Sequence, residues 1–322
     1  MNYLIKYGGL EANPLYNCSY DETLHTRREI IGTLSMILGT IASVLFIICL
    51  KIMLNPDLIK LSCYKIMFFV GVADVLGVFI CAILTGWLAF FGVVFCDYPL
   101  FIYISGSSAL FFWCSSCMGN IILLINRILC FKSAKYHEML FEGKRTYIAL
   151  ILPVMYGLFF FMYTKPVVFS PALFAWLFDP FIFPDKSAEY TNHYHTFNNL
   201  SVVVLTLTLY LYIAVIVIQK WRAPSEETHN QSKSINAIFK QAIAICAIDQ
   251  IGSAVYVLMN FITFPAWTGP FAELLWFLAH SFPIVTYLTI NRTMKSRFLK
   301  IFCKSNQSSR IHHSSVDTTA KS

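Results

Sequence analysis

Charged residues are scarce in this sequence of 322 residues. Only 13% of them are charged, against about 25% in soluble domains, and 57% are hydrophobic. No Asp, Glu, Lys or Arg occurs between Phe101 and Ile125. With 29 Phe and a mean hydropathy of +0.63, the chain lacks the polar groups that a water-exposed surface needs. The composition therefore excludes an ordinary soluble protein and predicts an integral membrane protein.

The sequence also lacks the motifs of several enzyme classes. It contains no H-E-x-x-H and no G-x-S-G, and neither Asp74 nor Asp249 stands in a Tyr-Asp or Gly-x-Gly-Asp context typical of intramembrane aspartyl proteases. His193 and His195 are too few ligands for a metal site. The last hydrophobic segment has no Lys for a retinal Schiff base. We expect no enzyme, no bound metal or cofactor, and no nucleic-acid partner.

Seven hydrophobic segments are long enough to cross a bilayer, for which a helix needs roughly 20 apolar residues. They occupy residues 30–52, 62–85, 100–126, 146–164, 197–219, 238–262 and 268–290. Residues 166–183 are also apolar but contain Pro166, Pro171 and Pro180, and lipid cannot satisfy the carbonyls that Pro leaves without donors. We expect this stretch to be an ordered loop against the membrane. The sequence predicts an all-α bundle of seven transmembrane helices.

Basic residues predict the orientation of the bundle. With the N-terminus outside, five of the 24 Lys and Arg lie outside and the remaining 19 inside, as the positive-inside rule requires. Arg27 and Arg28, just before the first span, are local exceptions to this rule because they would lie outside. Residues 1–29 contain no apolar signal segment, so the first span would direct insertion. We expect an extracellular segment (1–29), a transmembrane domain (30–303) and a disordered cytosolic tail (304–322).

Two features are expected outside the membrane at the N-terminal side. Of the ten Cys, only Cys18 and Cys96 lie on this oxidising side, so they form the one extracellular intrachain pair available. Two free thiols remain the alternative. Asn17 begins an Asn-Cys-Ser triplet and is the one serious candidate for glycosylation.

The last span is followed by a basic amphipathic stretch, residues 291–304. Helical spacing places Met294, Phe298, Ile301 and Phe302 on one face and most of the basic residues elsewhere. This pattern predicts a short helix along the cytosolic leaflet. Cys303, at its end, is a weak candidate for palmitoylation.

Three ionisable residues lie deep within the predicted spans. Asp74 and His280 are each about 12 residues from a span end, which is some 18 Å of helix, and Asp249 is about as deep. Such residues are expensive in lipid and should point into the bundle. We interpret Asp74 as a structural polar contact, and Asp249 and His280 as ligand-binding or switching residues. A structural role for all three is the alternative.

Short segments of the chain resemble rhodopsin-type G-protein-coupled receptors. "VGVADVLG" (70–77) is similar to their second span, which places Asp74 at the sodium-site acid, and "WLAFFGVVFC" (87–96) is similar to their first outer loop. Asn126-Arg127 resembles the Asp-Arg pair that ends their third span.

A finer resemblance is to nematode chemoreceptors of serpentine receptor class T, with class X as the nearest alternative. It covers about residues 16–303, and the order of its motifs makes it specific. The motifs are "YNCS" (16–19), "LSCYKIMFFVGVADVLG" (61–77), "INRIL" (125–129), "WLFDPFIFPD" (176–185), "TFNNLS" (196–201), "FKQAIAICAIDQIGSAVYVLMNF" (239–261) and "WFLAHSFPIVTYLTINRT" (276–293).

The resemblance implies a chemosensory receptor in the plasma membrane, with its N-terminus extracellular and its C-terminus cytosolic, and with a sensory cilium as a further candidate location. It would bind an external small molecule and activate a heterotrimeric G protein. Asn126 and Arg127 would contact the G protein, with the Arg127 head in water or near lipid phosphate and no buried partner. The ligand would lie between the outer halves of the spans, against Tyr103, Trp113, Asn198, Asp249, Tyr256, Asn260, Trp276 and His280.

The chain departs from the rhodopsin-type pattern at several motifs. Asn126 replaces the acid before Arg127, "CAID" (246–249) replaces Cys-Trp-x-Pro, and the second outer loop has no Cys. This last absence favours the pairing of Cys18 with Cys96. The alternative function is a transporter or a non-signalling structural membrane protein. The lack of an internal repeat and the sparse polar residues within the spans argue against a transporter.

Overall fold

The computed structural model describes residues 1–20, 25–221, 245, 247–259, 265 and 267–301. Six helices in this part are long and apolar enough to cross a membrane, and each coincides with a predicted span. They are α2 (Glu29–Met53), α4 (Ser62–Val78) continued by the π-helix η2 (Phe79–Leu84) and α5 (Thr85–Phe91), α6 (Pro99–Lys132), α8 with α9 (Arg145–Ala149, Ile151–Tyr163), α10 (His193–Trp221) and α12 (Thr268–Thr289).

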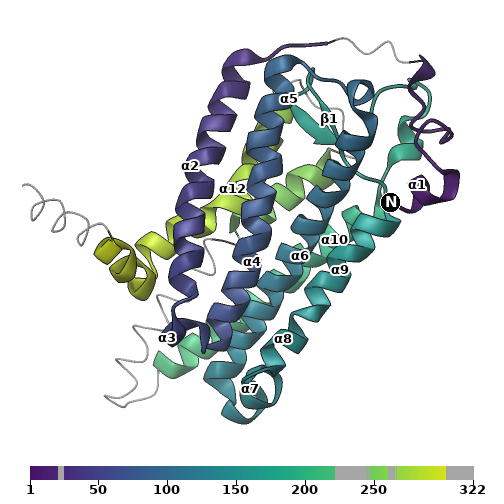
Figure 1. The fold of residues 1–322 in the computed structure, drawn as a ribbon. Coiled ribbons are helices and arrows are strands. Elements are labelled where there is room, and N and C mark those ends of the chain that lie inside the picture. The colour runs from purple at the N-terminus through teal and green to yellow at the C-terminus, as the bar shows by residue number, and fades with distance from the viewer. Residues whose placement is uncertain (21–24, 222–244, 246, 260–264, 266, 302–322) are drawn as a thin grey trace, which may run out of the picture.

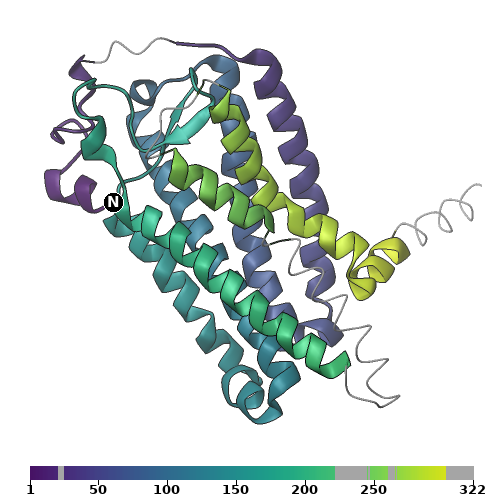
Figure 2. The same ribbon diagram turned by 180° about the vertical axis from the view of Figure 1, so that it is seen from behind.

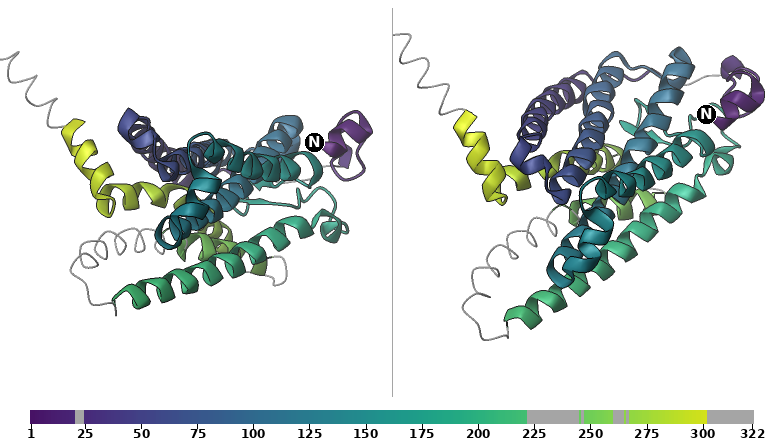
Figure 3. Two further views of the ribbon diagram at one scale, coloured as in Figure 1. Left: turned by 90° about the horizontal axis from the view of Figure 1, so that it is seen from below. Right: turned by 60° about the horizontal axis from the view of Figure 1, so that its bottom comes forward.

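The remaining predicted span, 238–262, lies largely outside the described residues. Its described part includes a shorter apolar helix, Ala247–Leu258. The prediction of an all-α membrane bundle is confirmed. Helix α6 is central because it packs against α4, α9 and α10, whereas α2 packs against α4, α5 and α12 (Figures 1 and 2). Seen from below, α10 forms one flank of the bundle (Figure 3).

Glycines allow the backbones of α2 and α5 to meet. A Cβ on Gly32 would lie 2.7 Å from the Gly86 carbonyl oxygen, and a Cβ on Gly86 would lie 2.5 Å from the Gly32 oxygen. Small residues at helix crossings are the usual means of close packing in membranes, where lipid supplies no hydrophobic driving force between helices. Between α4 and α5, the hydroxyl of Thr85 donates to the Ile80 carbonyl, 2.8 Å away, within the wider turn of η2.

Residues 166–183 do not form a helix, as predicted, and part of this stretch is a short hairpin. Strands β1 (Val168–Ser170) and β2 (Ala175–Leu177) pair antiparallel, with Phe169 opposite Trp176. Both of these side chains are buried against the helices. The stretch is therefore an ordered loop whose hairpin side chains pack against the helices, and its place against the membrane stays a prediction.

Arg28 holds the turn of this hairpin. Its guanidinium donates to the carbonyl oxygens of Pro171, at 3.1 Å, and Ala172, at 2.5 Å. The local exception to the positive-inside pattern therefore has a structural role.

The N-terminal segment folds onto the same end of the bundle. It contains α1 (Asn2–Tyr7) and η1 (Cys18–Tyr20), and Tyr16 is 1% exposed between the rings of Phe95, Tyr103 and Tyr190. Cys18 is bonded to Cys96, which lies in η3 (Phe95–Asp97). The segment before α2 is therefore folded against the bundle as well. We call this end of the bundle the disulfide end.

The other end of the bundle, which we call the arginine end, carries short helices. These are α3 (Pro56–Ile59), α7 (Ala134–Phe141) and a helix over residues 292–301 that turns away from α12 (Figure 1). In the last of these, Met294 is fully buried, Phe298 packs against the core and Ile301 is 47% exposed. Phe302, Cys303 and the tail 304–322 lie outside the described residues.

Candidate functional site

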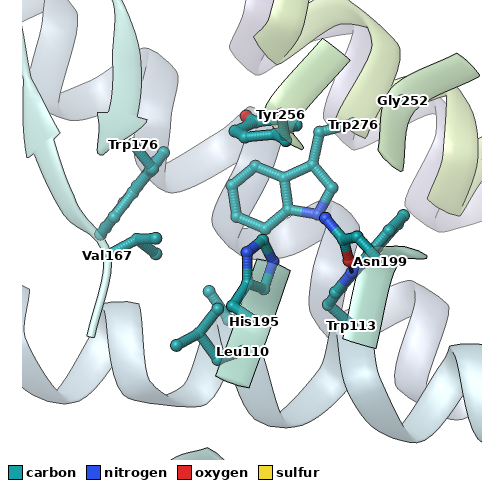
Figure 4. Close-up of a pocket in the computed structure, with 10 residues that line it drawn as sticks. Leu110, Trp113, Val167, Trp176, His195, Asn199, Gly252, Tyr256 and Trp276 are labelled. Atoms are coloured by element: carbon teal, nitrogen blue, oxygen red, sulfur yellow. Dashed lines mark hydrogen bonds between the residues drawn. The ribbon is translucent and has the colours of Figure 1, made fainter. Parts of the chain in front are cut away.

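A narrow cavity opens among α6, α10, α12, the hairpin and the helix Ala247–Leu258, toward the disulfide end (Figure 4). The cavity volume open to the centres of water-sized spheres is ≈ 30 Å³, so a ligand much larger than water would have to displace side chains. Aromatic rings dominate its walls. The lining residues are Ala109, Leu110, Trp113, Val167, Trp176, His195, Asn199, Gly252, Tyr256 and Trp276.

The hairpin reaches the cavity because α6 has a glycine at the contact. A Cβ on Gly106 would lie 1.6 Å from the carbonyl oxygen of Val167, so only glycine lets the two backbones meet. Val167 and Trp176 then form one wall, opposite Trp276 of α12 (Figure 4). The local backbone thus determines which side chains face the cavity.

A chain of hydrogen bonds fixes the polar side of the cavity. The hydroxyl of Tyr156 donates to Asn198 Oδ1 at 3.0 Å, and Asn198 Nδ2 donates to Asn199 Oδ1 at 2.9 Å. The indole nitrogen of Trp113 also donates to Asn199 Oδ1, at 3.0 Å. Two donors on one atom identify it as the amide oxygen, because an NH₂ group cannot accept them. The amide orientation of Asn199 follows from its neighbours.

A buried polar pair lies beneath the cavity. His280 Nδ1 is 2.9 Å from Asp74 Oδ1, which also accepts a hydrogen bond from Ser116 Oγ at 2.8 Å. Both ionisable side chains are at most 2% exposed. The rings of Trp113 and Trp276 lie 5.7 and 6.2 Å from the His280 ring. Two aromatic side chains of the cavity wall, Trp113 and Trp276, therefore pack against the His280 ring of this pair.

A second buried carboxyl lies beside the hairpin wall. Glu273 of α12 is 2% exposed, and its Oε1 is 3.3 Å from the Thr85 hydroxyl. The indole nitrogen of Trp176 donates to the same hydroxyl at 2.7 Å. Glu273 Oε2 has no hydrogen-bond partner in the described part of the chain. These contacts connect α5, β2 and α12 at the disulfide end.

The structure places the predicted ligand residues in several surroundings. Trp113, Tyr256 and Trp276 line the cavity, and Asn198 lies one hydrogen bond behind it. His280 does not line the cavity: it lies below the wall, with its Nδ1 2.9 Å from Asp74 Oδ1, so its predicted role as a ligand-binding or switching residue stays a prediction.

The other predicted ligand residues lie away from the cavity. Tyr103 packs edge-on against Tyr16 of the N-terminal segment, with ring centroids 5.2 Å apart. Asp249 lies 3.5 Å from Asn120 Nδ2 and does not line the cavity. Asn260 lies outside the described residues.

Several residues of the site were not predicted from the sequence, among them His195, Asn199 and Glu273. Helix α10 begins at His193 and places His195 and Asn199 in the cavity wall. Glu273 was overlooked although an acid within a predicted span is itself a functional signal. His193 is exposed whereas His195 is 6% exposed, so the two histidines do not share a face. No group of three possible metal ligands occurs among the described residues.

Lys165 lies just outside the spans, near the start of α10. Its ammonium group donates to the carbonyl oxygens of Glu189 and Thr191. Burial lowers the pKa of Lys165, and the nearby charge of Glu189 opposes that shift. Asn192 donates to the Lys165 carbonyl at 2.9 Å. The loop before α10 is thus held by polar contacts around one half-buried cation.

A larger cavity lies at the arginine end. It has ≈ 690 Å³ open to water-sized spheres and is lined by the ends of α4, α6 and α7 and by residues 290–293. Asn126 Nδ2 donates to Ser62 Oγ at 2.9 Å and to His137 Nε2 at 3.2 Å. Asn126 therefore connects α6 to α4 and α7 through uncharged hydrogen bonds, where an acid would form an ion pair with arginine.

Arg127 lines the same cavity and is 9% exposed. Helix α6 continues to Lys132, so the Arg127 side chain is enclosed among neighbouring helix ends and faces a cavity large enough for water. No ion pair or hydrogen bond of Arg127 occurs within the described residues. Its donors face the cavity, where an incoming partner could accept from them.

Asn17 lies on the surface of the N-terminal segment and is partly exposed. Its Oδ1 accepts hydrogen bonds from the backbone N–H of Ser19, at 2.9 Å, and from the Ser19 hydroxyl, at 2.7 Å. The neighbouring Cys18 is in the disulfide, so the triplet is held in one conformation.

Long apolar helices around a buried polar pair, with a cavity toward each end, define a multi-pass membrane protein. The family model described as "Serpentine type 7TM GPCR chemoreceptor Srt" matches residues 3–311. The chain belongs to this chemoreceptor family, and the resemblance to class T rather than class X is confirmed. "Serpentine receptor class T-55" from Caenorhabditis elegans is 23% identical over 253 residues, which cover 78% of this chain and 69% of that relative.

Proposed function

We propose that this chemoreceptor binds an external small molecule in the aromatic cavity and activates a heterotrimeric G protein at its arginine end. The disulfide end would then face the outside of the plasma membrane, and the C-terminus would be cytosolic. Cysteine pairing requires an oxidising environment, and the Cys18–Cys96 bond supports this orientation.

The observation that carries the proposal is the position of α6. This single helix contributes Trp113 to the aromatic cavity and Arg127 to the cavity at the other end. The two residues are 14 positions apart, which is about 21 Å along a helix. A ligand that moves α6 through Trp113 would therefore also move the arginine that faces the partner. Such coupling requires the ligand to favour one of two arrangements of the bundle.

The direct test is ligand-dependent nucleotide exchange on a co-expressed Gα, in cells that are screened with volatile and soluble compounds. We expect a response that Arg127→Ala abolishes. Arg145→Ala is the matched control, because Arg145 lies at the same end, does not line the cavity and binds only the Glu138 carbonyl among the described residues. An unchanged response in Arg127→Ala would contradict the coupling role of Arg127.

The orientation has its own test. An epitope added before the α1 helix should bind antibody on intact cells, whereas one added after residue 322 should bind only after permeabilisation. The reverse pattern would place the aromatic cavity on the cytosolic side and would contradict the binding of an external ligand.

A further inference from the structure

Two nitrogen donors in the wall of the aromatic cavity have no acceptor among the described residues. One is the indole N–H of Trp276, which points toward the side of the cavity that Asn199 lines (Figure 4). The other is Asn199 Nδ2, which must be the amino group because Trp113 and Asn198 both donate to Oδ1. Both side chains are at least nine-tenths buried. A donor in a cavity wall that has no protein acceptor is unfavourable while it stays unpaired, and it is available to a ligand.

The other two indoles in the wall already have acceptors. The N–H of Trp176 donates to the Thr85 hydroxyl at 2.7 Å, and that of Trp113 donates to Asn199. These two rings therefore offer the ligand only their apolar faces and edges. Among the indole and side-chain amide groups of the wall, the donors available to a ligand are those of Trp276 and Asn199.

No formal charge lines the cavity. Its described walls contain no Asp, Glu, Lys or Arg. The buried acids Asp74, Glu273 and Asp249 do not line it and contact His280, Thr85 and Asn120 instead. The ring of His195, the one titratable imidazole in the wall, packs against Phe178 with centroids 5.3 Å apart. A charged ligand would leave water without a counter-charge, which is strongly unfavourable.

Resting on the proposed ligand-binding function, the geometry points to a more specific ligand class: an uncharged, mainly apolar molecule with one hydrogen-bond acceptor, such as a carbonyl oxygen. The acceptor lies between Trp276 Nε1 and Asn199 Nδ2. The apolar part lies against Trp176, Val167 and Leu110 on the other side of the cavity. Trp276 and Asn199 are therefore the residues that determine specificity for the acceptor.

The test compares four probes of similar size on the purified full-length receptor in nanodiscs, with binding followed by ligand-observed NMR titration. Acetophenone carries the acceptor, isopropylbenzene replaces the acceptor with a methyl group, 1-phenylethylammonium is a cation and benzoate is an anion. We expect acetophenone to bind about three- to tenfold more tightly than isopropylbenzene, the gain of one net hydrogen bond. Neither ion should bind measurably.

Two tryptophan variants separate the hydrogen bond from the packing. Trp276→Phe should remove the preference for acetophenone while leaving the affinity for isopropylbenzene within about twofold. Trp176→Phe is the matched control, since its N–H is committed to Thr85: it should weaken both probes alike. A preference that survives in Trp276→Phe, equal binding of acetophenone and isopropylbenzene, or tighter binding of either ion would each overturn the ligand class.

Failure of the ligand class can be distinguished from failure of the proposed function, because the titration contains no G protein. Binding of all four probes without preference would leave the aromatic cavity as a ligand site and refute only the acceptor rule. If no probe binds, the acceptor rule is overturned as well. The receptor function itself would be contradicted only by a lack of nucleotide exchange with every ligand that binds.

Discussion

His280 and Asp74 are 206 positions apart in the sequence, yet His280 Nδ1 lies 2.9 Å from Asp74 Oδ1 in the centre of the bundle. The pair joins α12 to α4, and Ser116 of α6 shares the same carboxylate oxygen. Three helices therefore meet at one atom. Gly77 makes room for this contact, because a Cβ there would lie 2.7 Å from His280 Nε2.

Removing one member of this pair should destabilise the bundle. Asp74→Ala leaves His280 Nδ1 and the Ser116 hydroxyl without their shared partner, so we expect a loss of about 1–3 kcal/mol in the free energy of unfolding. Thermal unfolding in nanodiscs measures it. In a double-mutant cycle, His280→Ala should lower the free energy of unfolding less in the Asp74→Ala background than in the wild type, because the two residues are coupled. Fully additive losses would show that the contact contributes nothing.

The Cys18–Cys96 bond should stabilise the N-terminal segment on the bundle. It closes a loop between residues 78 positions apart, which restricts the unfolded chain and contributes about 2–4 kcal/mol. Cys18→Ser, Cys96→Ser and the double variant should lower the unfolding temperature by the same amount, because each removes one and the same bond. A double variant clearly less stable than either single one would contradict the pairing. Mass mapping under non-reducing conditions checks the bond directly.

Much of the bundle could be predicted from hydropathy alone, since a span needs only length and low charge. The hairpin at Val168–Leu177 could not, because its strands are only three residues long and lack the alternation of apolar and polar residues that marks a strand. Its position depends on Gly106, which lies over 60 residues earlier in the chain. Local sequence patterns do not predict contacts between residues so far apart in the chain.

Some residues of the aromatic cavity could be predicted from their depth within a predicted span. Trp113, Tyr256 and Trp276 fall in the outer halves of predicted spans and line the cavity. Tyr103 fits the same rule but is covered by Tyr16, and nothing local indicates that the N-terminal segment folds over it. The contact of His280 with Asp74 could not be predicted, because the two residues are 206 positions apart and become neighbours only in the folded bundle.

Asn126 should restrain the arginine end of the receptor. Its amide donates to Ser62 and His137, so Asn126→Leu removes the polar connection among α4, α6 and α7. If these contacts hold the resting arrangement, losing about 1 kcal/mol should raise basal nucleotide exchange about fivefold. Ser62→Ala, which removes one of the two acceptors, should raise it less. An unchanged basal rate in Asn126→Leu would mean that these hydrogen bonds are the same in both states.

Lys165 should make stability depend on alkaline pH. Burial lowers its pKa in the folded protein, whereas in the unfolded chain the pKa returns to its ordinary value of about 10.5. Between these two values the unfolded state binds more protons, so stability should rise with pH through this window and level off above it. Lys165→Met should flatten that rise in unfolding experiments between pH 8 and about 10.5. A stability that falls over the same range in the wild type, and not in the variant, would reverse the sign of the effect.

Gly106→Ala should leave the bundle folded but disturb the wall of the aromatic cavity. In Gly106→Ala the added Cβ would lie 1.6 Å from the Val167 oxygen, so the hairpin must move away from α6. Overpacking of this kind typically costs 1–3 kcal/mol, and the displaced hairpin would take Trp176 from the cavity wall. We expect a folded protein with a lower unfolding temperature and a loss of ligand binding, both measured in nanodiscs. Gly9→Ala is the matched control, because a Cβ there meets no atom within 4 Å. If Gly106→Ala binds ligand as the wild type does, the hairpin wall is not part of the binding site.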